Sequence, residues 1–174
     1  MTERTPSQTA GPFFSIGLCR FPVADLAPAN APNTLRFEGQ VLDGAGEGVP
    51  DALVEIWQAD ESGEYRSSWG WARCGTDEAG AYAFTTVKPG CVPGPDGRPQ
   101  APHIAVLVFA RGLLKPVLTR IYFPDEQDAN ASDPVLSAIG PSEDRETLIA
   151  QADDGRLRFD IRLQGDRQTV FFGL

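Results

Sequence analysis

The sequence predicts an all-β protein that folds as an antiparallel β-sandwich. Three observations support this prediction. Apolar residues recur mainly with a period of two, clusters rich in glycine, proline and aspartate separate the apolar segments, and only one segment is typical of a helix. At 174 residues the chain is long enough to bury a core as a single domain, residues 1–174.

Seven segments carry the strand pattern. In chain order, the expected strands are residues 35–43, 52–60, 81–87, 102–112, 118–123, 156–165 and 169–174. Phe37 and Val41 share one face of the first strand, and the turn sequence DGAG follows it. In the long fourth strand, Ile104, Val106 and Val108 form one continuous apolar face. Such faces indicate two sheets packed around a shared core.

Helix is expected only beside the sandwich, as one or two short flanking helices. The clearest candidate is residues 141–151, where Ser142 can cap the first turn and acidic residues follow it. Residues 89–102 contain five prolines and three glycines, so we expect an irregular loop there. Residues 1–34 include the sequence TPSQTAGPF, whose prolines favour an extended arm.

Composition excludes several classes of function. The 24 acidic residues exceed the 15 basic ones and give a formal net charge of −9, which would repel nucleic acid. No apolar run approaches the roughly 20 residues that cross a bilayer. The three cysteines are widely spaced and form no CxxC pair, so neither a disulfide framework nor a zinc site is expected. We therefore expect a cytoplasmic protein with reduced thiols.

The chain has one histidine, His103, which limits the available chemistry. A serine or cysteine nucleophile would need it as a base, but no GxSxG motif is present. Zinc or non-haem iron bound within one chain generally takes two or more histidines. From residue types alone, His103 is best interpreted as a packed, hydrogen-bonded side chain.

Several motifs together resemble the intradiol ring-cleavage dioxygenases. They are WQAD followed by a glycine turn and Tyr65, the PG-rich loop, the strand entry APHI, FARG, and the closing RFDIRLQG. With TPSQTAGP and TVFF added, the resemblance covers residues 5–174. It implies a β-sandwich and ferric iron, Fe(3+), held by two tyrosines and two histidines. Ferric iron is a hard cation that suits phenolate oxygen, and neutral imidazoles complete such a site.

Carried over onto this sequence, the ligand set is only half present. Tyr65 and His103 match the first tyrosine and the first histidine, but Val92 stands at the second tyrosine position and Ala105 at the second histidine position. Gln100 replaces an arginine that active chains carry near the substrate. The resemblance therefore implies vestigial ligand positions, no catalytic residue and no metal bound by this chain alone.

The same resemblance implies a role beside a second chain. In the two-chain enzymes of the family, the beta chain holds the iron and the alpha chain completes the pocket for a small aromatic substrate and O2. This chain resembles the alpha type, with Thr9, Gly11, Pro12 and Arg111 at the pocket positions. Gly11 lets a flat ring approach, Pro12 offers an apolar face, Thr9 adds a hydroxyl and Arg111 a permanent positive charge. Residues 1–34 are then expected to pack on an obligate beta-chain partner.

A second hypothesis belongs to another class. A metal-free β-sandwich could bind an aromatic ligand around Tyr65 and His103 without a partner. The two sites are separable, because His103 and Arg111 lie roughly 26 Å apart on a strand that rises about 3.3 Å per residue. The combination of TPSQTAGP with FARG favours the subunit, since a free binding module needs no interface arm.

Overall fold

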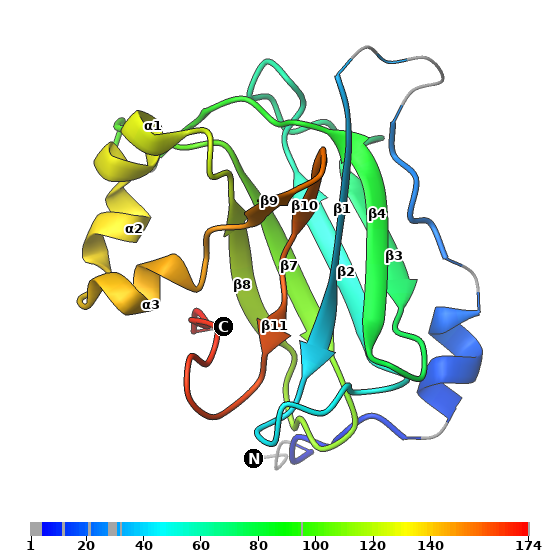
Figure 1. The fold of residues 1–174 in the computed structure, drawn as a ribbon. Coiled ribbons are helices and arrows are strands. Elements are labelled where there is room, and N and C mark those ends of the chain that lie inside the picture. Colours follow the sequence, from blue (N-terminus) through cyan, green and yellow to red (C-terminus); the bar gives the residue numbers. More distant parts are fainter. Residues whose placement is uncertain are drawn as a thin grey trace.

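Two β-sheets stacked face to face make up the body of the molecule (Figure 1). The computed structural model describes residues 5–11, 13–20, 22–27, 31, 33–94 and 96–173. One sheet contains β1 (Thr34–Leu42), β4 (Ala81–Val87), β9 (Gln151–Asp153), β10 (Arg156–Arg158) and β11 (Ile161–Arg162). The other contains β2 (Leu53–Gln58), β3 (Trp71–Gly75), β7 (His103–Phe109) and β8 (Val117–Tyr122). The predicted β-sandwich is confirmed.

The two sheets differ in strand direction. The four-stranded sheet is antiparallel throughout, in the order β3-β2-β7-β8. In the other sheet β4 is antiparallel to β1, but β10 and β11 lie parallel to β1 on its opposite edge. The expected strand 156–165 is interrupted between β10 and β11, where the Asp160 side chain accepts a hydrogen bond from the Gln40 amide at 3.1 Å. The antiparallel prediction therefore holds for one whole sheet and for part of the other.

The core follows the alternation of the sequence. Phe37, Phe84, Ile104, Val106 and Val108 are all buried in one apolar cluster between the sheets. In β-strands alternate side chains face the same side, so a period of two places these residues together.

The polar side chain of Gln58 is also buried between the sheets. Gln58 donates from Nε2 to the Val87 carbonyl at 2.9 Å and accepts from the Thr86 hydroxyl at 2.9 Å. These bonds satisfy an amide that is fully removed from water. The glutamine of the WQAD motif therefore links β2 to β4.

Several sequence predictions were wrong about strands. The segments of β3 and β9 were not expected as strands. Residues 169–173 form only a single bridge, between Phe172 and Leu118, instead of a strand. The loop at residues 89–102 contains a short hairpin of β5 (Val92–Pro93) and β6 (Pro99–Gln100). Short segments of this kind offer too few residues for a period to show.

The helices gather on one flank, beside β8 (Figure 1). They are α1 (Gln127–Ser132), α2 (Pro134–Ala138) and α3 (Ser142–Glu146), so the described residues form three short α-helices where one or two were expected. The expected helix 141–151 ends early, at Glu146, and Ser142 lies inside it instead of capping it. A second apolar cluster lies under these helices and contains Ala101, Tyr122, Leu136 and Leu148.

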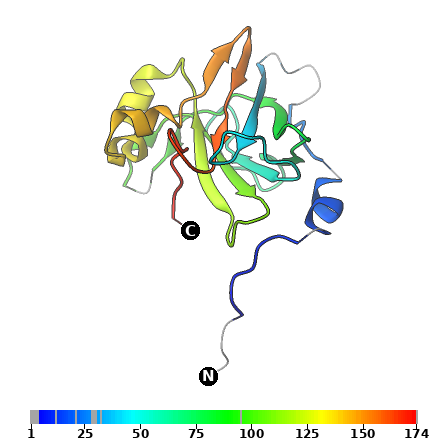
Figure 2. The ribbon, with the colours of Figure 1, turned by 60° about the horizontal axis from the view of Figure 1, so that its bottom comes forward.

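The N-terminal arm is not extended throughout. Residues 5–11 lead away from the sandwich (Figure 2), and a π-helical turn, η1 (Ser15–Cys19), follows. Val23 and Asp25 then form bridges with Arg73 and Thr85 of this chain's own sheets. Pro12 lies outside the described residues. Within the described part of the chain, no helix is both long and apolar enough to cross a membrane.

Candidate functional site

The predicted site residues lie in two separate places, at opposite ends of β7. His103 begins this strand, whereas Arg111 follows its last residue, Phe109. Tyr65, Val92 and Ala105 belong to the His103 end; Thr9 and Gly11 belong to the Arg111 end. The structure thus separates the four ligand positions from the pocket positions Thr9, Gly11 and Arg111. The fourth pocket position, Pro12, lies outside the described residues.

Strand register places His103 and Ala105, two of the four ligand positions, on the outer face of the four-stranded sheet. Trp57 pairs with Ala105 across β2 and β7, and Ala105 pairs with Arg120 across β7 and β8. Tyr65 stacks on Trp57, with ring centroids 5.9 Å apart and planes 5° from parallel. His103 and Tyr122 form the neighbouring pair on the same face.

His103 is held as a neutral imidazole. Its Nδ1 lies 2.8 Å from the Ala101 carbonyl oxygen, which can only accept, so Nδ1 carries the proton. Burial, together with the positive charge of Arg120, lowers the pKa of His103 to about 4. The packed, hydrogen-bonded state inferred from the sequence is confirmed.

Arg120 is the residue of this region that sequence reasoning missed. Its Nη1 donates to the Gln100 side-chain oxygen at 2.7 Å and lies 3.3 Å from the Tyr122 hydroxyl oxygen. Its guanidinium carbon lies 5.8 Å from the centre of the Phe172 ring. The segment LTRIYF indicated a strand, but nothing in its pattern indicated which residue of β7 the arginine would face.

The buried carboxylate of Asp133 holds Tyr122 and the start of β7 in place through hydrogen bonds. Asp133 accepts hydrogen bonds at 2.8 Å from the backbone amides of Ala101, Val135 and Leu136. It also accepts one from the Tyr122 hydroxyl at 3.3 Å. Asp133 therefore caps α2 and fastens the helix to the start of β7.

The residues present do not fit ferric iron. Tyr65 and His103 could each supply a donor atom, but Val92 and Ala105 have no donor side chain. Burial raises the pKa of Tyr65, which disfavours the phenolate that ferric iron prefers. The Arg120 guanidinium adds a fixed positive charge beside both remaining donors. Of the two remaining donors, His103 is buried and hydrogen-bonded to the Ala101 carbonyl, whereas Tyr65 is 47% exposed.

At the other end of β7, the arm meets the turn that contains FARG. The Thr9 hydroxyl oxygen accepts a hydrogen bond from the Gly112 amide at 2.6 Å. Arg111 pairs with Asp51, with 3.1 Å between Nε and the carboxylate, yet its side chain is 61% exposed. A Cβ added to Gly11 would meet no atom within 4 Å, so the space beside Gly11 is open. The structure therefore brings Thr9 next to Arg111 on an exposed edge.

Comparison with known proteins identifies the family. A family model described as Dioxygenase matches residues 23–165, and the chain is 44% identical to a Protocatechuate 3,4-dioxygenase alpha chain from Pseudomonas putida. The chain belongs to the intradiol dioxygenase family. The match to the Pseudomonas putida chain covers 99% of this chain and 97% of that one.

Two more protein chains and one solved structure extend the comparison. A Protocatechuate 3,4-dioxygenase alpha chain from Burkholderia cepacia is 41% identical over 98% of this chain and 97% of its own length. The beta chain from the same organism is 33% identical over 75% of this chain and 64% of its own. The dioxygenase domain of a carbohydrate-binding fusion protein from Streptomyces sp. SirexAA-E has a TM-score of 0.66 at 24% identity, covering 92% of this chain and 99% of that one. This structural likeness shows that the fold is that of an intradiol dioxygenase.

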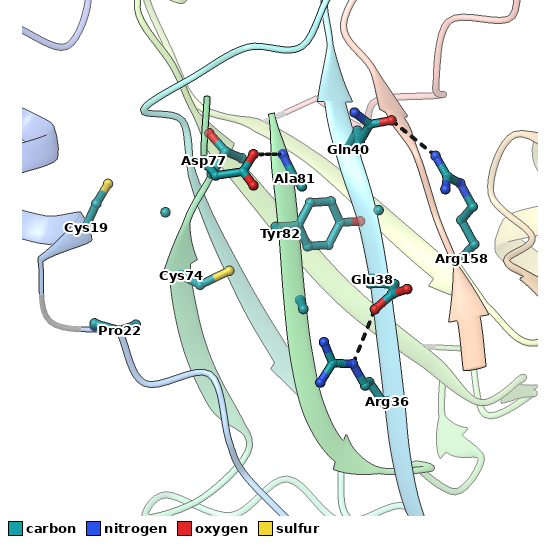
Figure 3. A pocket seen from close by; sticks show the side chains of 14 residues that line it. Cys19, Pro22, Arg36, Glu38, Gln40, Cys74, Asp77, Ala81, Tyr82 and Arg158 are labelled. Atoms are coloured by element: carbon teal, nitrogen blue, oxygen red, sulfur yellow. Dashed lines mark hydrogen bonds and ion pairs between the residues drawn. The ribbon is translucent and has the colours of Figure 1, made fainter. Parts of the chain in front are cut away.

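This intradiol dioxygenase chain also has a cavity that the sequence did not indicate. It measures about 640 Å³ and lies between η1 and the sheet formed by β1 and β4 (Figure 3). Its charged lining residues are already paired, as Arg36 is with Glu38 at 3.3 Å and Arg158 with Gln40 at 3.2 Å. None of the predicted site residues lines it, so it is separate from both ends of β7.

Proposed function

We propose that this chain is the alpha subunit of a protocatechuate 3,4-dioxygenase and completes the active site of an iron-bearing beta subunit. The observation that carries the proposal is the hydrogen bond between Thr9 and Gly112, which joins the arm to the FARG turn on an exposed edge. Similarity to alpha chains over almost the whole length supports it. The same similarity favours the subunit over a metal-free binding module.

The proposed reaction inserts both atoms of dioxygen between the two hydroxylated carbons of protocatechuate and gives 3-carboxy-cis,cis-muconate. Ferric iron on the beta subunit would supply the binding and activation of the catecholate. The proposed role of this chain is to shape the pocket, exclude water and orient the substrate. All three of its cysteines are free thiols, which agrees with the proposed cytoplasmic location.

Arg111 is the group best suited to orient a carboxylate. Asp51 engages its Nε, and no described residue bonds to its terminal Nη atoms. Those two nitrogens can donate to the carboxylate of protocatechuate as a charge-assisted pair. Gly11 and Thr9 would form the adjacent wall, and a role for Pro12 in this wall rests on the sequence alone.

Exposed apolar side chains on the arm support a partner chain. Phe13 is 82% exposed and Ile16 is 57% exposed, although both are large hydrophobic residues. Leu114, in the turn after FARG, is 62% exposed. Large apolar side chains that are exposed in this way are available for a protein interface, and we assign them to the contact with the beta subunit.

The proposal is tested by co-expressing the chain with the beta chain and measuring protocatechuate-dependent oxygen uptake. Arg111→Ala should lower kcat/KM by about tenfold to a hundredfold, because a charged hydrogen bond to the substrate is lost. Iron content per complex should not change.

The matched control is Arg167→Ala, since Arg167 is an exposed arginine far from the arm in sequence. It should leave turnover unchanged. Failure of the two chains to form a complex would contradict the proposal, as would turnover and stoichiometric iron in the isolated chain. Loss of iron in Arg111→Ala would mean that its role is misassigned.

A further inference from the structure

Arg120 lies beside the position where a second histidine ligand would stand. The register of β7 and β8 pairs it directly with Ala105. Opposed residues of an antiparallel pair have Cβ atoms about 4.5–5.5 Å apart, so their side chains share one patch of the sheet face. The small Ala105 side chain leaves room there for the guanidinium.

The guanidinium is fixed at this place. Gln100 accepts its Nη1 hydrogen bond at 2.7 Å, and Tyr122 contacts the same nitrogen at 3.3 Å. Tyr122 is itself bonded to the buried Asp133. A side chain with two polar partners and an aromatic neighbour on its face cannot swing away without breaking these contacts.

Arg120 lies close to the remaining donor residues. Its Nη1 is 3.3 Å from the Tyr122 hydroxyl oxygen, and the rings of Tyr122 and His103 are 5.7 Å apart between centroids. Tyr65 stacks on Trp57, which flanks Ala105 on the side opposite to Arg120. A cation bound between Tyr65 and His103 would therefore meet a positive charge already in place.

We propose that Arg120 occupies the metal position of this chain and excludes cations from it. The loss of iron is then enforced by a built-in positive charge and does not result only from the missing donors at Val92 and Ala105. Repulsion between the guanidinium and a metal ion grows with the charge of the ion, so ferric iron is disfavoured most. The inference does not depend on the beta subunit, because every residue in it belongs to this chain.

The test restores a ligand and then removes the charge. Ala105→His supplies a second imidazole on the same strand face as His103, and the full-length chain is offered ferric citrate. We expect little iron in A105H and at least about tenfold tighter apparent iron binding in A105H/R120Q. Metal analysis after gel filtration measures the content, and visible absorption reports tyrosine coordination.

Two controls separate charge from other effects. A105H/R120K keeps a positive charge and should stay poor in iron, whereas A105H/R167Q removes a charge elsewhere and should resemble A105H. Circular dichroism checks folding, and Arg120→Met replaces Arg120→Gln if the glutamine variant unfolds. Equal iron affinity in A105H and A105H/R120Q would overturn the proposal. A gain of iron in A105H/R120K equal to that in A105H/R120Q would also overturn it.

Discussion

The imidazole of His103 is 4% exposed and donates from Nδ1 to the Ala101 carbonyl. Protonating Nε2 would place a second positive charge in a buried region that already holds Arg120. The folded state therefore resists protonation of this residue, whereas the unfolded chain does not. That difference makes the stability of the chain depend on pH.

Stability is expected to fall as the pH is lowered from 6.5 toward 4. The pKa of His103 is about 4 in the folded state against an ordinary value of 6.5, so the unfolded state binds more protons in this window. The loss amounts to at most about 3 kcal/mol. Urea unfolding at a series of pH values measures it.

His103→Gln is the matching variant. In this variant the free energy of unfolding should change less with pH between 5 and 6.5. Carboxylates whose pKa values are lowered, such as those of Asp96 and Asp125, stay ionised in this range. An unchanged slope in this variant would show that another group is responsible.

At the scale of elements, β1 depends on close contact with a neighbouring backbone. A Cβ built on Gly39 would lie 1.8 Å from the Phe159 carbonyl oxygen. The same oxygen accepts a hydrogen bond from the buried Tyr82 hydroxyl at 2.6 Å. Gly39, Tyr82 and Phe159 thus join β1, β4 and the break between β10 and β11.

Substitutions at this junction should destabilise the chain in a defined order. Gly39→Ala should cost more than about 3 kcal/mol, because the backbone of Phe159 must move. Tyr82→Phe should cost about 1–2 kcal/mol through the lost hydrogen bond. Gly140→Ala, where an added Cβ meets nothing within 4 Å, serves as the control. Chemical denaturation gives the ranking, and a neutral Gly39→Ala would contradict the description of the junction.

The long strands could be predicted from sequence because their alternation spans six or more residues, as in β1, β4 and β7. The short β3 was missed because only Ala72 and Cys74 face the core in it. Arg120 could not be assigned a role, since its importance arises from register across two strands. A sequence alone does not set that register until the turn geometry is known.

At the scale of the whole molecule, the two ends of β7 differ in their partners. At the His103 end, Arg120, Tyr122 and Asp133 are joined by hydrogen bonds within the chain, and Tyr65 is 47% exposed. The Arg111 end carries an arm that leads away from the body (Figure 2). Contacts that another chain makes with the arm would leave the hydrogen bonds at the His103 end intact.

Polar substitutions on the arm should weaken assembly but not folding. Phe13→Ser combined with Ile16→Ser should reduce affinity for the beta chain by at least about tenfold, because large exposed apolar groups dominate interfaces. The unfolding free energy of the isolated chain should change by less than about 0.5 kcal/mol. Size-exclusion chromatography and calorimetry measure the two effects.

Glu78→Ser, at an exposed turn, is the surface control. If the variant with Phe13→Ser and Ile16→Ser kept its full affinity for the beta chain, the arm would not be part of the interface. A large loss of stability in the isolated chain would instead give the arm a role within this chain's own fold.

The parallel pairing of β1 has a consequence for synthesis. The Gln40 amide bonds to Asp160, 120 residues further along the chain, and β10 and β11 also come from that late segment. During synthesis β1 is made early, but it can pair with β10 and β11 only after residues 156–162 have also been made. Sheets that close only through such distant contacts fold slowly and leave edges open in the meantime.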